Sequence, residues 1–399
     1  LGLQFGYGMM EHCRHLVSAW GGGTVVLSPR DLNDDQLRRL SAGLLELAHS
    51  RVLLDPQFYL PHADHERLCS HSYWPANYES GAFWSGIGLA NLLAQLGNLN
   101  AELKTSAFIL PGLLADRVDD DWLATQSMVL EEAASRGGKR ELYMTVALGA
   151  DATRDQDQIA KLLEAAAEWS PGGYYIVCEH PDGQYLVADP NWLANVLDLV
   201  AGFKLLGRRV ILGYCNHQML IASAAKIDAI CSGTWMNVRS FPPDKFRTQY
   251  EEEIKQRTTW YYCPQALSEY KVPFLDIAHR LRLLPQMKPP ATLKSTYADA
   301  LFSGVQPSSV GFTEQAAFRH FLQCLRSQCI GSSLGTFDET VSEHERALDD
   351  AESLLKTLGA ARIRGQLRDF TEIIDVNRAA LAVLTSTRGP MLRRRWAQL

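Results

Sequence analysis

The stretch Val52-Leu53-Leu54-Asp55-Pro56-Gln57 decides the fold, because an unbroken apolar run ends in a carboxylate and a proline. Proline ends the strand, since it has no backbone N–H to donate to a neighbouring strand. A continuous apolar run indicates a strand that is covered on both faces, as in a parallel sheet. A strand end of this kind becomes informative if other strands of the chain end in the same way.

Seven further apolar runs alternate with helical patterns. They lie at 3–7, 24–28, 106–110, 142–148, 173–178, 209–214 and 228–232. The helical patterns between them begin near Asn33, Asp119 and Asp155, which are residue types that cap helices well. Eight strands with interleaved helices predict an α/β fold, a (β/α)8 TIM barrel over residues 1–243. A doubly wound sheet is less well matched, because Gly6-Tyr7-Gly8 lacks the third glycine of the dinucleotide fingerprint.

Residues 244–399 are predicted to form a helical C-terminal region. Charged helical patterns occupy 244–262 and 313–399, and the longest one runs from about 338 to 384. The final cluster, Arg393-Arg394-Arg395-Trp396, is interpreted as a solvated terminus rather than a phosphate-binding tail. The helices of this region are a candidate surface for a protein partner.

Composition and charge restrict the class of protein. The chain has 399 residues, 46% of them hydrophobic, and a formal net charge of −6, so its surface as a whole is not adapted to nucleic acid. The eight cysteines are scattered, and several lie in strand-like apolar runs. That usage predicts reduced thiols and a cytoplasmic protein. No apolar run reaches the roughly 18 to 20 residues of a membrane span, so no membrane association is predicted.

Polar side chains follow the predicted strands, where a barrel places its chemistry. Asp55 and Glu179 come directly after buried apolar runs, where a carboxylate rarely occurs without a partner, and they form the predicted catalytic pair. The predicted substrate-binding residues at the same strand ends are Arg30, Gln57, Phe58, His180, Asn216, His217, Cys231 and Trp235. Asp31 and Asp151 are interpreted as helix caps, and capping is also an alternative for Asn216.

Histidines and cysteines in two early segments raise the question of a metal. Glu11-His12-Cys13-Arg14-His15 forms one group, and His62, His65, Cys69 and His71 form the other. Neither a CxxC pair nor an HExxH helix accompanies them. Neither a metal site nor a cofactor is therefore predicted.

Three segments carry a resemblance to a known family. Arg209–Ser232 reads as an apolar strand, a glycine turn, an alanine-rich helix and a strand that begins at Ile227-Asp228. Leu54-Asp55-Pro56-Gln57-Phe58 looks like a shortened Thr-Asp-Ser-Gly-Gly-Phe-Gln turn, and Tyr143–Cys178 is similar in order to two βα units. Over residues 51–240 the chain resembles the tRNA-guanine transglycosylases and the related enzymes that place deazaguanines into DNA.

The resemblance implies a TIM barrel that acts on an N-glycosidic bond or a deazapurine-like base. It implies Asp55 as nucleophile or general base and Glu179 as its acid/base partner. It further implies a nucleobase or nucleic acid as the substrate. Paralogues of such enzymes occur in bacterial antiphage operons, so a role in antiphage defence is one expectation.

The chain also departs from the family pattern. Cys231 stands where the family has its nucleophilic aspartate, whereas Asp55 matches the aspartate near the exchanged base. Other base-reading positions carry Pro111, Leu148 and Cys178-Glu179, and of the zinc ligands only Cys263 and at most His279 remain. Ordinary guanine exchange in tRNA and a structural zinc are therefore not expected. Cys231 is not expected to be an activated nucleophile, because it follows Ala229-Ile230 on a buried strand, away from cations.

Two alternatives stay open. One is a non-catalytic barrel that binds a ligand or nucleic acid within a complex, which the replaced family residues favour. The other is an unrelated TIM-barrel glycosidase that uses Asp55 and Glu179. Such a pair has its carboxyl groups about 5 Å or about 6.5–9.5 Å apart, depending on the stereochemical course.

Overall fold

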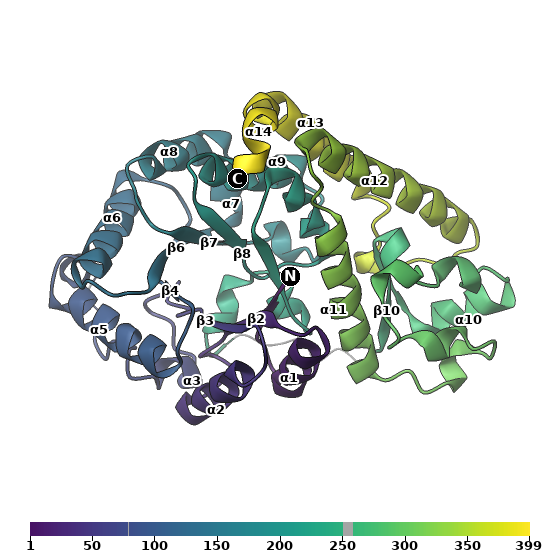
Figure 1. Ribbon diagram of the computed structural model, residues 1–399, viewed down its shortest axis with the longest axis horizontal. Coiled ribbons are helices and arrows are strands. Elements are labelled where there is room, and N and C mark those ends of the chain that lie inside the picture. Colours follow the sequence, from purple (N-terminus) through teal and green to yellow (C-terminus); the bar gives the residue numbers. More distant parts are fainter. Residues whose placement is uncertain (79, 250–257) are drawn as a thin grey trace. The chain divides into compact units, whose positions relative to one another are not determined.

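Parallel strands form a nearly closed barrel in the computed structural model, which describes residues 1–78, 80–249 and 258–399 (Figure 1). Its eight strands, within these residues, are β1 (Gly2–Gln4), β2 (Gly23–Leu27), β3 (Ser50–Leu54), β4 (Ala107–Ile109), β6 (Glu141–Leu148), β7 (Gly173–Cys178), β8 (Arg209–Leu212) and β9 (Ala229–Ser232). Their order is β3-β2-β1-β9-β8-β7-β6-β4, and the short β5 (Leu114–Ala115) pairs with β6. At the seam between β3 and β4, the Ser106 N–H donates to the Val52 carbonyl at 2.9 Å. The predicted (β/α)8 TIM-barrel fold is confirmed.

Helices cover the outside of this sheet, as Figure 1 shows for α2, α5, α6 and α8. The helices between barrel strands are α1 (Met10–Ala19), α2 (Asp34–Leu45), α3 (Glu66–Cys69), α4 (Ser80–Trp84), α5 (Ile87–Glu102), α6 (Asp120–Ser135), α7 (Ala150–Arg154), α8 (Gln156–Ala166) and α9 (Pro190–Leu205). The caps predicted at Asn33, Asp119 and Asp155 are confirmed, because each side chain accepts a backbone N–H at the start of its helix.

Two predicted caps are wrong. Asp31 does not cap α2, since Asn33 occupies that position and forms a capping box with Gln36. Asp151 lies inside the first turn of α7, where it forms an ion pair with Arg154 at 3.2 Å. Asp31 instead accepts the Ser28 hydroxyl at 2.7 Å and forms an ion pair with Arg30 at 3.1 Å.

The chain divides into two compact units that are discontinuous in sequence. The barrel unit consists of Leu1–Gly183, Asp198–Cys215 and Ile227–Glu251, and the second unit of Gln184–Leu197, Asn216–Lys226 and Glu252–Leu399. Each unit is described by itself below. None of the helices in the described residues is both long enough and apolar enough to cross a membrane.

The second unit is mainly helical with one hairpin. Its elements include η2 (His217–Ala225), β10 (Trp260–Cys263), β11 (Ser268–Lys271), α10 (Val272–Arg280), α11 (Glu314–Gly331), α12 (Phe337–Ala360), α13 (Ile374–Thr387) and α14 (Gly389–Arg395). The single helix predicted over 338–384 is wrong, because α12 ends at Ala360 and α13 begins at Ile374. Arg362 takes a left-handed backbone (φ 59°) that ends the helix. The apolar pattern continues across the break because Ile363 and Phe370 are both buried.

The C-terminal residues are not simply solvated. The Trp396 side chain is 3% exposed, donates its indole N–H to the Leu334 carbonyl at 3.0 Å and packs edge-on against Phe337. Arg393 forms an ion pair with Asp338 at 2.8 Å. The interpretation of this cluster as a solvated terminus is therefore wrong for Trp396, which anchors the end of the chain to α12.

Strand register decides which side chains enter the barrel. Side chains alternate between the two faces of a strand, and parallel partners in register share a face. Gln4 pairs with Val26, and Val26 with Leu53, so these three share one face, and so do Ser28 and Asp55 two residues further along. Tyr175 lies across from them on β7 and reaches both Gln4 and Asp55. The carboxyl end of the barrel interior is therefore polar.

Candidate functional site

A buried carboxylate stands at the centre of the carboxyl end of the barrel. Asp55 has no exposed surface. Its Oδ1 accepts hydrogen bonds from the Gln57 backbone N–H at 2.9 Å and the Tyr59 hydroxyl at 2.8 Å. Its Oδ2 accepts one from the Tyr214 hydroxyl at 2.8 Å, and the Tyr175 hydroxyl lies at 3.4 Å. We call Asp55, Gln57, Tyr59, Tyr175 and Tyr214 the Asp55 cluster.

Burial sets the protonation behaviour of the cluster. It is the largest influence on Asp55 and raises its pKa, while the bonds from Tyr214, Tyr59 and Gln57 and the charge of Lys245 oppose the rise. Burial and then the Asp55 charge hold the pKa of the three phenols well above the ordinary tyrosine value. The tyrosines therefore stay protonated and act as donors.

Two residues of the cluster have an unfavourable backbone. Gln57 (φ 54°) and Tyr214 (φ 55°) both lie in the left-handed region, where a side chain costs roughly 1–2 kcal/mol per residue. Their side chains contact each other, since Gln57 Nε2 donates to the Tyr214 hydroxyl at 3.0 Å and to Ser28 Oγ at 2.9 Å. Backbone strain of this kind occurs preferentially at functional sites, where the surroundings hold it in place.

Tyr175 connects the cluster to the first strand. Its hydroxyl donates to Gln4 Oε1 at 3.0 Å, and Gln4 Nε2 is buried without a hydrogen-bond partner. Room for the ring comes from Gly213, because a Cβ at that position would lie 2.4 Å from the Tyr175 oxygen. The barrel interior is thus shaped around this phenol.

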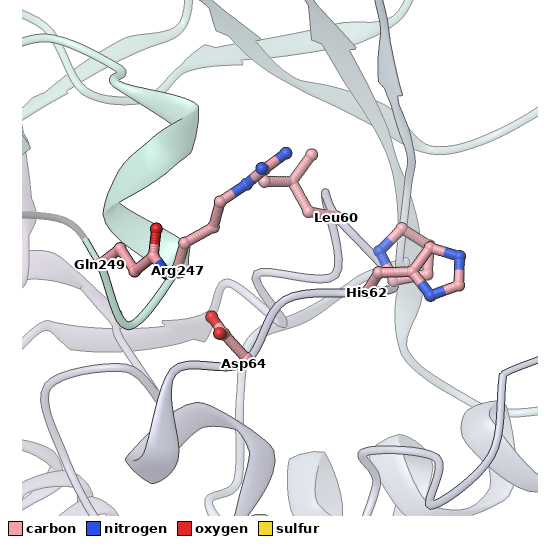
Figure 2. A pocket seen from close by; sticks show the side chains of 6 residues that line it. Leu60, His62, Asp64, Arg247 and Gln249 are labelled. Atoms are coloured by element: carbon pink, nitrogen blue, oxygen red, sulfur yellow. The ribbon is translucent and has the colours of Figure 1, made fainter.

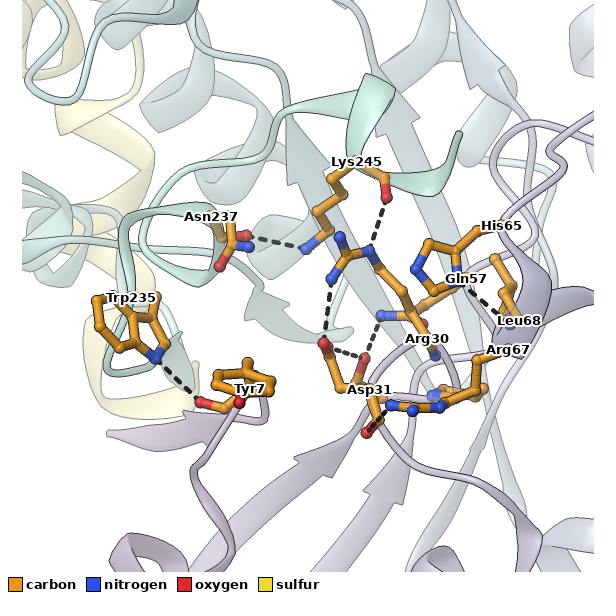
Figure 3. A network of polar contacts seen from close by, with 12 residues as sticks. Tyr7, Arg30, Asp31, Gln57, His65, Arg67, Leu68, Trp235, Asn237 and Lys245 are labelled. Atoms are coloured by element: carbon orange, nitrogen blue, oxygen red, sulfur yellow. Dashed lines mark hydrogen bonds and ion pairs between the residues drawn. The ribbon is translucent and has the colours of Figure 1, made fainter. Parts of the chain in front are cut away.

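A charged network adjoins the cluster (Figure 3). The Arg30 backbone N–H donates to Gln57 Oε1 at 2.9 Å, and its guanidinium contacts Asp31 at 3.1 Å and the Lys245 carbonyl at 2.6 Å. The Lys245 ammonium lies 3.8 Å from the centre of the Tyr214 ring and donates to the Asn237 carbonyl at 2.9 Å. Predicted residues Arg30 and Gln57 therefore lie together with Asp55.

Several charged side chains at this end of the barrel unit are buried. Arg239 and Lys245 are 2% and 1% exposed, and the Arg30 side chain is 10% exposed. The carboxylates among them are Asp31, whose side chain is 8% exposed, and Asp55. Arg30 and Lys245 therefore lie beside the carboxylates of Asp31 and Asp55 in a low-dielectric setting, where a buried charge needs a partner.

Glu179 is the accessible carboxylate of the pair predicted from the sequence. It follows β7, is half-buried, and its Oε2 accepts the Ala150 backbone N–H at 3.1 Å. Burial raises the pKa of Glu179, and nearby Asp116, Asp244 and Asp151 raise it further. A half-buried carboxyl group with a raised pKa suits proton transfer better than an enclosed one.

The other predicted residues of the barrel unit are spread around its end. Phe58 is fully buried and packs against Trp74 at a ring distance of 4.9 Å. Cys231 is 1% exposed on β9, close to Gly2, where an added Cβ would lie 2.6 Å from its sulfur. His180 is buried in the turn after β7, and Trp235 donates its indole N–H to the Tyr7 carbonyl at 3.1 Å (Figure 3).

Asn216 and His217 belong to the second unit. Asn216 caps η2 by accepting the Gln218 N–H at 2.8 Å, as its capping alternative anticipated, and it also donates to the Tyr185 carbonyl. The His217 ring is 1% exposed and packs 5.0 Å from Tyr262 among other aromatic rings. The packing of both residues is accounted for within that unit.

A pocket of about 360 Å³ also lies in the barrel unit. It is lined by Leu60, Pro61, His62, Asp64, Arg247 and Gln249 (Figure 2). Asp55 and Glu179 do not line it. The pocket lies where the loop after β3 meets the segment that follows β9, and its polar side chains differ in charge. It is therefore a space beside the Asp55 cluster rather than part of it.

Among the described residues, no three His, Cys, Asp or Glu side chains form a group that could hold a metal ion. His71 is instead bound to the Asp34 carboxylate at 2.6 Å and to backbone carbonyls. Cys263 is fully buried in the second unit, where burial raises its pKa to about 12.

Several residues of the site were not predicted. Tyr59, Tyr175 and Tyr214 lie in apolar runs and look like core residues in the sequence, and Lys245 lies in a segment that looks like a surface helix. Gln4 is the residue from which the site could have been predicted, because it is a polar residue inside the first predicted strand. Its position would have pointed to a polar barrel interior.

No model of a known protein family matches the chain, and no curated protein matches its sequence.

Proposed function

We propose that the barrel unit is a transglycosylase-like enzyme that acts on the N-glycosidic bond of a nucleobase-containing substrate at the carboxyl ends of its strands. The observation that carries this proposal is the convergence of two strained residues, Gln57 and Tyr214, on the buried Asp55. Strain and a buried carboxylate in one place are difficult to explain by stability alone.

The chemistry of the groups supports a nucleobase as the ligand. Gln4 Nε2 is a buried donor without a hydrogen-bond partner, and the polar edge of a base can satisfy such a donor. The Arg30 guanidinium and the Lys245 ammonium, which lie together at the cluster, suit a phosphate attached to the sugar. The resemblance to transglycosylases points to the same class of substrate.

Each carboxylate receives its own role. Glu179 is half-buried and has a raised pKa, so it is assigned as the general acid that protonates the departing base. The new bond to the sugar carbon is then formed by water in base release, or by the incoming base in base exchange. Asp55 is fully enclosed, so it is assigned as a positioning residue that orients the phenols of Tyr59 and Tyr214. This assignment differs from the expectation that Asp55 is the nucleophile.

The test is an assay of base release and base exchange. Purified protein is incubated with nucleosides and short DNA and RNA oligonucleotides that contain guanine or deazaguanines. Glu179→Gln is expected to lower the rate on the order of 100-fold, because it removes the proton donor. Glu164→Gln is the matched control, since Glu164 is exposed on α8, and it should retain the full rate. Equal rates for Glu179→Gln and wild type would reject the assignment.

A second candidate function is a binding barrel without turnover. The hydrogen bonding of Asp55 favours it, because its two oxygens already accept from Gln57, Tyr59 and Tyr214, which are donors supplied by the protein itself. This function predicts calorimetric binding of a nucleotide with no base release, and affinity that Glu179→Gln leaves unchanged. Base release by the wild-type protein would exclude it.

A further inference from the structure

The segment 241–249 covers the Asp55 cluster. Phe241 packs 5.0 Å from the Tyr59 ring and 5.2 Å from the Tyr214 ring, and Phe246 packs 5.2 Å from Tyr59. Phe241, Lys245 and Phe246 are each at most 1% exposed. The three side chains are therefore inserted into the barrel mouth, and they contribute to the complete burial of Asp55.

Hydrogen bonds at three points tie this segment to the loops beneath it. The Arg30 guanidinium donates to the Lys245 carbonyl at 2.6 Å, and the His65 N–H donates to the Phe246 carbonyl at 3.3 Å. At its far end the Thr248 N–H donates to Asp64 Oδ1 at 2.7 Å, and the Thr248 hydroxyl donates to the Asp64 carbonyl. Thr248 and Asp64 are exposed to solvent, so this pair can break without unfolding of the barrel.

The two ends of the segment differ in attachment. Phe241 forms a parallel bridge with Glu179 at the end of β7, and Pro242 and Pro243 stiffen the chain directly after it. Beside the Thr248 end lies the pocket of about 360 Å³, between Arg247 and Gln249 on one side and Leu60–Asp64 on the other. The segment thus has one end bridged to β7 next to Glu179, and another end held by a solvent-exposed pair of hydrogen bonds beside the pocket.

We propose that residues 243–249 form a lid that opens at the Thr248–Asp64 contact and so controls access to the Asp55 cluster. Opening withdraws Lys245 and Phe246 from Tyr214 and Tyr59 and exposes the phenols to a ligand. The inference rests on the proposed function in one respect, namely that the cluster is where a substrate binds. The motion itself is a property of the chain and needs no substrate.

Hydrogen–deuterium exchange of the full chain tests the lid. In the wild type, amides of 243–249 and of 55–60 should exchange by a local opening, at rates that low urea does not change. Amides of β6 (Glu141–Leu148) should exchange only by global unfolding, at rates that rise with urea. Exchange of 55–60 that follows the urea dependence of β6 would overturn the proposal.

A substitution at the Thr248–Asp64 contact gives a more specific test. Asp64→Ala removes the acceptor of the Thr248 N–H and should speed exchange of 243–249 and 55–60 on the order of tenfold, with β6 unchanged. The matched control is Asp119→Ala, which removes a carboxylate that accepts a backbone N–H (Trp122, 2.8 Å) at the start of α6. It should leave 55–60 unchanged.

Three outcomes of the variant experiment count against the lid. The first is faster exchange of 243–249 while the exchange of 55–60 is unchanged. The second is an equal acceleration of exchange in all peptides, including β6. The third is an exchange pattern in Asp64→Ala that equals that of the wild type. Because no substrate is present, a lid without N-glycosidic activity would leave this inference intact and reject only the proposed function. Conversely, N-glycosidic activity in a protein whose 55–60 amides exchange only by global unfolding would support the proposed function and reject the lid.

Discussion

Burial is the main cause of the raised pKa of both Glu179 and Asp55, but the two shifts should be detected by different measurements. Glu179 is half-buried and can exchange its proton with a ligand, whereas Asp55 is enclosed by donors from the protein. Under the proposed function, the pH dependence of activity is expected to report on Glu179, and that of stability on Asp55.

The alkaline limb of the activity profile is assigned to Glu179. If it acts as a general acid, kcat/KM falls as the pH rises through its pKa, which burial places above the ordinary glutamate value. Substitution by Gln should remove this limb along with most of the rate. A limb that persists unchanged in Glu179→Gln would assign it to another group.

The stability profile should carry a contribution from Asp55. Its folded-state pKa is raised above the unfolded value, so the folded state binds a proton more tightly than the unfolded state. The contribution is fully present below the unfolded pKa and is lost as the pH rises through the folded pKa. Urea unfolding at pH values from about 4 to 8 should show this loss in wild type. Asp55→Asn should have a flatter profile, whatever its absolute stability.

At the scale of the element, Gly213 directly after β8 leaves room for the ring of Tyr175 on β7. Gly213→Ala would place a methyl group 2.4 Å from the Tyr175 oxygen, and overpacking of this kind costs about 1–3 kcal/mol. The matched control is Gly97→Ala in α5, where an added Cβ meets nothing within 4 Å. That change should stabilise the protein by about 0.4–1 kcal/mol. Chemical denaturation of both variants measures the contrast, and equal stabilities would contradict it.

The strands show what a sequence can predict about the elements. The apolar runs predicted the positions of all eight barrel strands, because a strand that is buried on both faces has a continuous series of apolar residues. The first strand, expected at 3–7, ends at Gln4, since Phe5, Gly6 and Tyr7 continue into the loop. The left-handed backbones of Gln57 and Tyr214 left no signal, because neither residue is a glycine or an asparagine.

At the scale of the whole molecule, distant pairings limited what could be predicted. The Asp55 cluster joins residues that are 120 and 159 positions apart in sequence, Tyr175 and Tyr214. Strand parity predicts that Asp55 points inward but not which phenols meet it. The division into two units could not be predicted either. The segments 184–197 and 216–226 resemble their sequence neighbours of the barrel unit in residue composition and pattern.

Trp396 should contribute strongly to the stability of the second unit. Its buried indole packs against Phe337 and lies 4.3 Å from the Lys226 ammonium. Trp396→Ala should cost about 3–5 kcal/mol, as expected for a buried aromatic residue. Arg394→Ala, at an exposed neighbouring position, should change stability by no more than about 0.5 kcal/mol. Similar unfolding midpoints for both variants would restore the interpretation of a solvated terminus.

The single proton of the Tyr175 hydroxyl has two acceptors, Gln4 Oε1 at 3.0 Å and Asp55 Oδ2 at 3.4 Å. When Asp55 is ionised, both acceptors compete for that proton. When Asp55 is protonated, it must itself donate, and the Tyr175 oxygen can accept only if its own proton points to Gln4. The Tyr175 phenol therefore acts as a two-position relay on β7, and it couples the charge of Asp55, after β3, to the hydrogen bonding of the Gln4 carboxamide on β1.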